Sequence, residues 1–331
     1  EVSRVVKRCR EAQVDWAQCT LNDRARLAMR LGQTILERRN QFAEVLSSET
    51  GRHTAECLIN EAVTVVNYAK AAIQTARTAL ATEKVKLSAI EYPGKKAVIE
   101  AVPRGVIGVI APWNYPLGNF MKPLFPGLLS GNGLVLKPSE HTPRTGALLG
   151  DVCNEIFPDG LIQVVQGGGD VGAALVDAGV DGLVFTGSVA TGRKVAMSAA
   201  ASFIPCSVEL GGKDAAIVLA DCHLERTVAG ITQWSMHNAG QNCAAIERVY
   251  VEDAIAGEFI AKLSAAVGRL SVSPSSSPSD LGPLQNPAQF RLVREQVESA
   301  IAHGAKIEVG GSPTGHGLGY QPTVLSRCSP D

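Results

Sequence analysis

The sequence predicts an α/β fold built on parallel β-sheets, and three observations support this fold class. From Gly105 onward, short β-branched or aliphatic runs alternate with helix-compatible stretches of roughly ten to twenty residues, the pattern of parallel strands joined by crossover helices. Glycine-rich turns follow several of these runs. With 331 residues, of which 45% are hydrophobic and 19% charged, the chain is long enough for two domains with separate cores.

Helices and a hairpin are expected before this alternating region. Asn22 is predicted to cap a helix over residues 23–38, where leucine and isoleucine recur about every four residues on one face. Residues 84–103 change character and contain the turn sequence Tyr92-Pro93-Gly94, which predicts a β-hairpin. Because both faces of this hairpin have mixed polarity, it is better suited to a subunit contact than to a core.

The elements of the alternating region follow in order. The expected strands are residues 106–111, 134–136, 162–165, 183–185, 216–219 and 248–251. A helix is expected over residues 255–270. Residues 271–279 are rich in serine and proline, so they predict an exposed loop.

Composition restricts the class of ligand. The formal net charge is −1, so no chain-wide field attracts nucleic acid or an anionic membrane, and a small-molecule ligand is expected. The cysteines are scattered, without a C-x-x-C pair, which favours a reduced cytoplasmic protein. No apolar run approaches the roughly 20 residues that cross a bilayer. His223 and His237 lack the neighbours of a tetrahedral ligand set, so no metal is expected.

Two motifs directly follow predicted strands. The sequence PWNYP, residues 112–116, is a rigid loop between two prolines at a strand end, where ligands of α/β sheets collect. Its Asn114 can donate a side-chain N–H to a developing oxyanion; the alternative is an Asn that supports a turn. Lys137 and Glu140 of the motif KPSE can bind the two hydroxyls of an adenine ribose, and the acid disfavours a 2′-phosphate. The alternative is a solvated Lys–Glu pair.

Two glycine-rich turns join predicted strands to helices. Residues 167–172 fit the pattern G-x-G-x-x-G, which is a weak signal on its own. The turn around Gly187 and Ser188, leading to Gly192, presents small residues and backbone N–H groups at a helix N-terminus, where a pyrophosphate can bind. For both turns, the alternative is an ordinary turn that needs glycine for its backbone angles.

Two further residues can carry chemistry. Glu209 precedes a double glycine where the backbone must bend, and a half-buried carboxylate there can act as a general base. The alternative is a structural carboxylate that accepts from the glycine amides. Cys243 stands in the polar sequence GQNCA, unlike a buried core cysteine, and is a candidate nucleophile. The alternative is an inert packing cysteine.

The order and spacing of these motifs resemble the aldehyde dehydrogenase superfamily. The series is PWNYP, LKPSE, FTGS, ELGGK and GQNC, in that order along the chain. Glu209 and Cys243 are 34 positions apart, which matches the spacing of base and nucleophile in that family. The resemblance extends over essentially the whole chain, from the helical region around Trp16 to the segment at residues 321–324.

The resemblance implies a role for each candidate residue. Cys243 would be the nucleophile and Glu209 the general base, and Asn114 would form the oxyanion hole together with the backbone N–H of Cys243. The residues implied to bind the cofactor are Trp113, Lys137, Glu140, Gly187, Ser188 and Gly192. The implied cofactor is NAD, which Glu140 favours, with NADP as a possible substitute because members of the family use both.

The resemblance also implies an architecture. The family fold has two Rossmann-like parallel-sheet α/β domains and a projecting β-hairpin for oligomerisation. We therefore expect an NAD-binding domain over residues 1–210, with the hairpin at about 84–103, and a catalytic domain over residues 211–331. The catalytic domain is expected to be incomplete at its C-terminus, because the family's E-E-I-F-G-P segment is absent. A homodimer or homotetramer is expected.

The activity that the resemblance implies is the oxidation of a small-molecule aldehyde to a carboxylic acid. The reaction would pass through a thiohemiacetal and a thioester on Cys243. One alternative is a coenzyme A-acylating semialdehyde dehydrogenase, which the retained Glu209 disfavours. The other alternative is a truncated, non-catalytic member of the fold.

Overall fold

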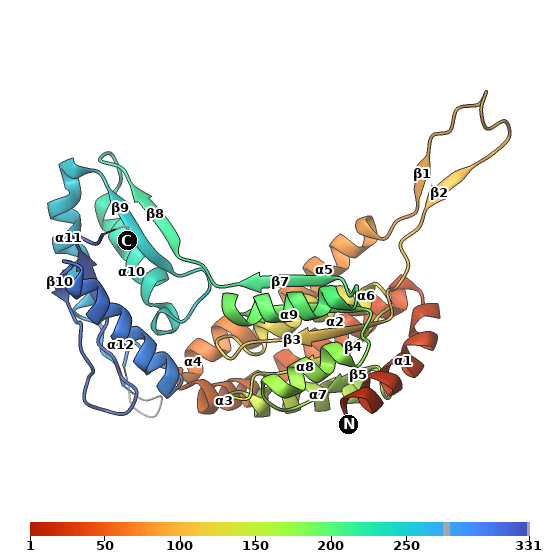
Figure 1. Ribbon diagram of the computed structural model, residues 1–331, viewed down its shortest axis with the longest axis horizontal. Helices are drawn as coiled ribbons and strands as arrows, with labels where there is room; N and C mark the ends of the chain where they lie inside the picture. The colour runs from red at the N-terminus through yellow and green to blue at the C-terminus, as the bar shows by residue number, and fades with distance from the viewer. Residues whose placement is uncertain (274–278, 330–331) are drawn as a thin grey trace. The chain divides into compact units, whose positions relative to one another are not determined.

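The computed structural model describes residues 1–273 and 279–329, and Figure 1 shows the course of the chain. The described residues form two compact units. Unit 1 comprises Glu1–Val45 and Leu58–Leu210, and unit 2 comprises Leu46–Cys57 and the described chain from Gly211 onward. The chain therefore passes between the units after residues 45, 57 and 210.

A five-stranded sheet with the strand order β5-β4-β3-β6-β7 organises unit 1. Its strands are β3 (Val106–Ile110), β4 (Gly133–Lys137), β5 (Ile162–Val164), β6 (Gly182–Gly187) and β7 (Cys206–Leu210). All neighbours pair in parallel, so every strand ends at the same edge of the sheet. The chain adds β4 and β5 on one side of β3 and then β6 and β7 on the other side, which places a topological switch point between β3 and β6. The predicted α/β class with a parallel sheet is confirmed.

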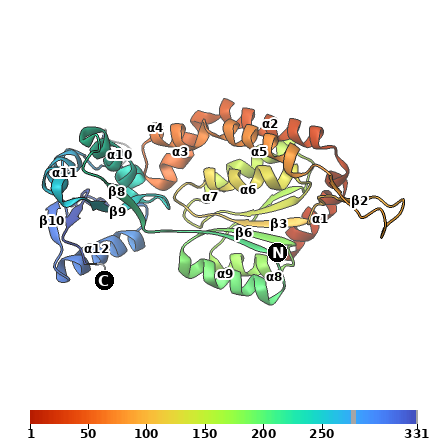
Figure 2. The ribbon, with the colours of Figure 1, turned by 90° about the horizontal axis from the view of Figure 1, so that it is seen from above.

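Helices cover both faces of this sheet (Figure 2). On one face lie α6 (Gly118–Leu129) and α7 (Pro143–Ile156), with α2 (Leu21–Glu37) and α5 (Val65–Ala79) outside them. On the other face lie α8 (Gly169–Asp177), α9 (Val189–Ala201) and α1 (Val2–Gln18). The helical segments between α2 and α5 are α3 (Arg39–Thr50), α4 (Thr54–Cys57) and the π-helix η1 (Leu58–Ala62).

The composition of the central strands explains why the sheet forms. β3 and β4 are buried along their whole length and consist almost entirely of aliphatic residues and glycine. Parallel strands that are covered on both faces need such runs, because side chains on neither face meet water. Val106 and Ile110 of β3 pack in one cluster with Leu175 of α8 and Ala199 of α9. Burial of each large aliphatic side chain contributes roughly 1.5–3 kcal/mol relative to exposure.

The expected hairpin is present in unit 1. β1 (Glu83–Val85) pairs antiparallel with β2 (Ala97–Ile99), and Gly94 adopts a φ of 70° in the connection between them. The hairpin extends away from the sheet and helices of its own unit (Figure 1), and Ile90 and Val102 are 93% and 77% exposed. The hairpin prediction is confirmed, whereas its role in a subunit contact stays a prediction.

Unit 2 contains a second, smaller set of strands. β8 (Asp214–Val218) pairs in parallel with β9 (Ile246–Val251), and α10 (Leu224–Met236) and α11 (Asp253–Val267) pack against them in one core cluster. The 3₁₀ helix η2 (His237–Gly240) follows α10, α12 (Pro287–Ala302) contributes to a separate cluster, and β10 (Lys306–Val309) pairs antiparallel with β11 (Val324–Ser326). No helix among residues 1–273 and 279–329 is long and apolar enough to span a membrane.

The N-terminal cap of α2 differs from the sequence prediction. Thr20, not Asn22, is the capping residue, and its Oγ1 accepts a hydrogen bond from the backbone N–H of Asp23 at 3.2 Å. The backbone of Thr20 is extended and the helix begins at Leu21. Asn22 is already the second residue of the helix, so it cannot be the residue that caps it.

Strand β7 is an element that the sequence pattern does not predict. Glu209, which was expected at a bend of the backbone, lies inside this strand, opposite Thr186 of β6. β7 has only one neighbour in the sheet, and most of its residues are exposed, so it needs no continuous aliphatic run.

Of the loop expected over residues 271–279, residues 274–278 lie outside the described part of the chain.

Asp181 anchors the start of the central strand to α1. Its Oδ2 accepts from the backbone N–H of Val106 at 2.7 Å and from Nη1 of Arg10 at 2.5 Å. Gly105 adopts a φ of 129°, and a Cβ at that position would collide with the Asp181 carboxylate. Helix α1, strand β3 and the start of β6 are thereby connected through one carboxylate.

We expect Asp181→Ala to lower the free energy of unfolding by about 1–3 kcal/mol, because it leaves the N–H of Val106 without its acceptor. The matched control is Asp159→Ala, which removes an exposed ion pair with Arg8, another residue of α1, at 2.6 Å. The control is expected to cost less than about 1 kcal/mol. Urea unfolding followed by circular dichroism measures both changes, and equal costs would contradict the role given to Asp181.

Candidate active site

The candidate cofactor residues of unit 1 lie at the carboxyl edge of its sheet. Lys137 is the last residue of β4 and Gly187 is the last residue of β6. Both strands flank β3, with Ile110 opposite Lys137 on one side and opposite Phe185 on the other. The loop that carries Asn114 leaves the end of β3 at the switch point. One edge therefore holds all the predicted site residues of unit 1: Trp113, Asn114, Lys137, Glu140, Gly187, Ser188, Gly192 and Glu209.

Lys137 is a buried charged group at this edge, with 4% of its surface exposed. Its aliphatic stem runs beside Gly172 of α8, where a Cβ would lie 3.6 Å from the Lys137 Cδ, and its Nζ donates to the carbonyl of Pro138 at 3.0 Å. Burial lowers the pKa of Lys137, while the nearby charges of Glu140 and Asp170 act in the opposite direction. A buried ammonium group near the exposed carboxylate of Glu140 suits the hydroxyl groups of a ribose.

Gly167 and Gly172, the two ends of the glycine run at residues 167–172, have structural functions in this arrangement. Gly167 adopts a φ of 148°, a backbone conformation that other residues rarely reach. Gly172 provides the surface along which the stem of Lys137 runs. These observations favour an ordinary turn that needs glycine for its backbone angles over a phosphate-binding fingerprint at residues 167–172.

The turn after β6 forms the N-terminus of α9. Ser188 caps this helix, since its Oγ accepts from the backbone N–H of Thr191 at 3.2 Å. Gly192 lies so close to the sheet that a Cβ there would collide with Leu210 of β7. The missing side chain lets the first turn of α9 approach the strand ends, and a helix N-terminus at such an edge attracts a phosphate group. The residues therefore fit a dinucleotide by their chemistry.

Asn114 has a fixed orientation. Its Oδ1 accepts from the backbone N–H of Tyr115 at 3.0 Å and from Nδ2 of Asn119 at 3.3 Å. Because two donors engage the oxygen of the amide, the side-chain Nδ2 is its donor end. Trp113 beside it is half-buried.

Glu61 supports this loop, and the sequence analysis missed it. The side chain comes from η1, is 1% exposed, and its Oε2 accepts from the backbone N–H groups of Leu117 and Gly118 at 2.8 and 2.9 Å. A carboxylate in this position stabilises the N-terminus of α6 and holds the loop of Asn114. No sequence signal marks the pairing, because Glu61 and Leu117 are 56 positions apart.

Glu209 is exposed, so the expectation of a half-buried carboxylate is wrong. Cys206 and Leu210 of β7 pack against the core cluster of unit 1, and alternation along the strand directs Glu209 to the opposite face. Since β7 is the last strand of the sheet, a neighbouring strand lies on only one side of Glu209.

Cys243 is the one predicted site residue in unit 2, and it is exposed. It lies in a turn in which the backbone N–H of Ala245 donates to the carbonyl of Asn242 at 3.1 Å. The side-chain Oδ1 of Asn242 accepts from the backbone N–H of Ala244 at 3.1 Å and lies 3.8 Å from the Cys243 Sγ. The thiol is thus presented to solvent from a turn that is closed by side-chain and backbone hydrogen bonds.

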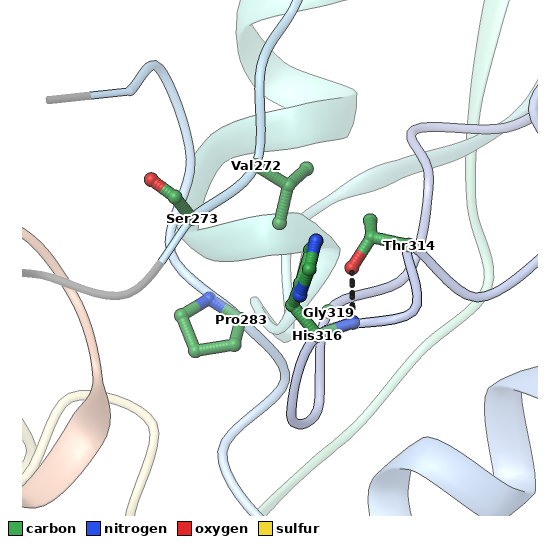
Figure 3. A pocket seen from close by; sticks show the side chains of 6 residues that line it. All are labelled: Val272, Ser273, Pro283, Thr314, His316 and Gly319. Carbon is green, nitrogen blue, oxygen red and sulfur yellow. Dashed lines mark hydrogen bonds between the residues drawn. The ribbon is translucent and has the colours of Figure 1, made fainter. Parts of the chain in front are cut away.

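A small pocket in unit 2 holds none of these candidates (Figure 3). It encloses about 80 Å³ and is lined by Val272, Ser273, Pro283, Thr314, His316 and Gly319. The backbone N–H of His316 donates to Thr314 Oγ1 at 3.4 Å across it. Its volume admits a few water molecules and is far below that of ordinary small-molecule sites.

Fold and candidate site together define an α/β protein with a dinucleotide-type sheet edge and an exposed cysteine in a constrained turn. The model of the aldehyde dehydrogenase family matches residues 1–331. The chain belongs to the aldehyde dehydrogenase family, and the resemblance seen in the sequence is confirmed.

Relatives of known name agree with this assignment. The chain is 36% identical over 325 residues to "4,4′-diapolycopene aldehyde oxidase" of Methylomonas sp., a match that covers 98% of this chain and 61% of that protein. It is 34% identical over 338 residues to "Putative succinate-semialdehyde dehydrogenase (NADP(+)) 2" of Mycobacterium bovis, with 100% and 64% covered. The chain thus spans about three fifths of the length of these curated relatives.

A solved structure agrees with this fold. Betaine aldehyde dehydrogenase from Staphylococcus aureus, crystallised in complex with NAD⁺, superposes with a TM-score of 0.93 at 28% identity, covering 99% of this chain and 66% of that one. The Mycobacterium relative is named for NADP⁺. The cofactors named for these two proteins agree with the expectation of NAD, with NADP possible.

The exposure of the thiols leads to a test of the cysteine environments. Cys243 and Cys328 are exposed, whereas Cys9, Cys57 and Cys153 are buried. Burial raises the pKa of Cys9 to about 12 and raises the pKa of Cys153 as well. At about pH 8, iodoacetamide is therefore expected to alkylate the two exposed thiols at least about tenfold faster than the three buried ones. Peptide mass spectrometry measures the rates, and equally fast labelling of Cys153 would contradict the described packing.

Proposed function

We propose that the protein oxidises an aldehyde to a carboxylic acid with a nicotinamide dinucleotide as the hydride acceptor. The observation that carries the proposal is the exposed thiol of Cys243 in a turn closed by hydrogen bonds, in a chain of the aldehyde dehydrogenase family. In this proposal unit 1 binds the dinucleotide and unit 2 supplies the nucleophile. The β1–β2 hairpin would serve as a contact in a homodimer or homotetramer.

Cys243 begins the reaction. Its thiolate sulfur attacks the aldehyde carbon, a C–S bond forms, and the C=O electron pair moves to oxygen. The side-chain Nδ2 of Asn114 and the backbone N–H of Cys243 donate to this oxyanion. An aldehyde has no good leaving group, so the nucleophile is needed to create an sp³ carbon from which hydride can depart. The electron pair of the oxyanion re-forms the C=O bond as hydride leaves the carbon, so that a thioester remains on Cys243. A bound nicotinamide dinucleotide would supply the acceptor for that hydride.

Glu209 completes the reaction. Its carboxylate removes a proton from a water molecule, whose oxygen attacks the thioester carbon. The C–S bond breaks, the carboxylic acid leaves, and the Cys243 sulfur is regenerated. The exposure of Glu209 suits this role, because a carboxylate that takes a proton from water must be reachable by water.

We expect Cys243→Ala to reduce NADH formation by at least about a thousandfold, because it removes the proposed nucleophile that forms the thiohemiacetal. Binding of NAD, measured by calorimetry, is expected to stay within about twofold of the unaltered protein, since the cofactor residues belong to unit 1. The matched control is Cys328→Ala, which removes the other exposed thiol at no predicted site and should leave the rate unchanged. Turnover that persists in Cys243→Ala would overturn the assignment.

The proposed preference for NAD depends on Glu140. A carboxylate that accepts from the ribose hydroxyls repels the 2′-phosphate of NADP. Glu140→Thr should therefore raise the ratio of kcat/KM for NADP to that for NAD by about tenfold or more. Glu91→Thr, which removes an exposed carboxylate of the hairpin, is the control and should leave the ratio unchanged. A ratio that does not move in Glu140→Thr would rule out this residue as the selectivity determinant.

A further inference from the structure

The backbone that leads into the Cys243 turn adopts an uncommon conformation. Asn238 and Ala239 both have a φ of 54°, and Gly240 follows with a φ of 75°. Residues with a Cβ seldom adopt the left-handed region, and two in succession are held there only when their surroundings fix them. Hydrogen bonds and apolar packing around residues 238–241 hold this segment in the left-handed conformation.

The side chain of Gln241 closes the left-handed turn. Its Nε2 donates to the carbonyl of Asn238 at 3.1 Å, and its backbone N–H donates to the same carbonyl at 3.0 Å. In return, Nδ2 of Asn238 donates to the carbonyl of Gln241 at 3.2 Å. Asn238 is 4% exposed, so these bonds are largely protected from water.

The other end of the same amide reaches a distant part of unit 2. Oε1 of Gln241 accepts from the backbone N–H of Gln285 at 2.9 Å. Gln285 immediately precedes Asn286, whose side chain caps α12 by accepting from the backbone N–H of Gln289 at 3.0 Å. The side chain of Gln285 also donates to the carbonyl of Glu49 at 3.1 Å. The partner of Gln241 thus belongs to a well-anchored segment.

Packing adds a second connection between the same two segments. Ala239 packs against the cluster formed by Leu284, Val297 and Tyr320. The methyl group of Ala239 and the amide of Gln241 therefore attach the turn to the same part of unit 2, one by apolar contact and the other by hydrogen bonds. Cys243 follows Gln241 by two residues, so the direction of its side chain depends on this attachment.

We propose that Gln241 is a positioning residue for Cys243, acting through a side-chain amide that joins the left-handed turn at Asn238 to the start of α12. This inference rests on the proposed function, because it takes Cys243 as the nucleophile. The position requires a glutamine, since the nitrogen serves the turn and the oxygen serves Gln285. Leucine offers neither group, and glutamate offers only the acceptor.

The test compares Gln241→Leu and Gln241→Glu with the control Gln296→Leu, which alters an exposed glutamine on α12. The rate of iodoacetamide alkylation of Cys243 is measured against pH by peptide mass spectrometry, and kcat and KM are measured from NADH formation with a panel of aldehydes. In Gln241→Leu, kcat should fall at least about tenfold while KM for NAD stays within about twofold, because a small displacement of a reacting group is costly. Its alkylation profile should differ from that of the unaltered chain at least about threefold in rate, and the control should match the unaltered chain.

Gln241→Glu should retain part of the activity lost in Gln241→Leu, since it keeps the acceptor for Gln285. If Gln241→Leu does not fold, as judged by circular dichroism, Gln241→Glu carries the same comparison. Unaltered kcat and alkylation in the folded variants would overturn the positioning role. If the unaltered chain forms no NADH, the proposed function fails, but alkylation needs no dehydrogenase activity, and its change or constancy still supports or overturns the positioning role.

Discussion

The burial of the central parallel strands is the constraint on which the structure of unit 1 depends. β3 and β4 are enclosed on both faces, so their side chains must be aliphatic and their hydrogen bonds must go to neighbouring strands. Parallel pairing then brings all carboxyl ends to one edge. The polar groups of the candidate site follow directly from that geometry, because only at the strand ends does the chain leave the core and gain freedom to carry them.

At this edge and in the turn that carries Cys243, polar groups and backbone segments adopt unfavourable environments or conformations that packing of the core does not require. Lys137 is enclosed although burial lowers its pKa, and Glu61 is enclosed while its carboxylate holds a loop. In unit 2, two non-glycine residues adopt left-handed backbone before Cys243. Burial of a charged group and left-handed backbone in non-glycine residues are both unfavourable in free energy. They persist only where surrounding contacts fix the conformation, and they concentrate at functional sites.

Much of the architecture and the candidate residues could be predicted from local patterns. Aliphatic runs followed by glycine turns located β3, β4, β5 and β6, and the turn sequence around Gly94 located the hairpin. Local patterns do not predict β7, because an edge strand needs no apolar run. They also do not distinguish Thr20 from Asn22 as the cap of α2, because both residue types are favoured at helix N-termini. The exposure of Glu209 followed from the position of β7 in the sheet, which its own neighbours in sequence do not reveal.

The sequence by itself determined the α/β class, the order of the motifs and the residues that can carry chemistry, because these depend on side-chain type and on spacing along the chain. Tertiary structure alone decided which distant groups hold those residues in place. Glu61 meets Leu117 across 56 positions, and Gln241 meets Gln285 across 44. Hydrogen bonds of this kind depend on where packing brings two backbone segments, and no local pattern of residues encodes that distance.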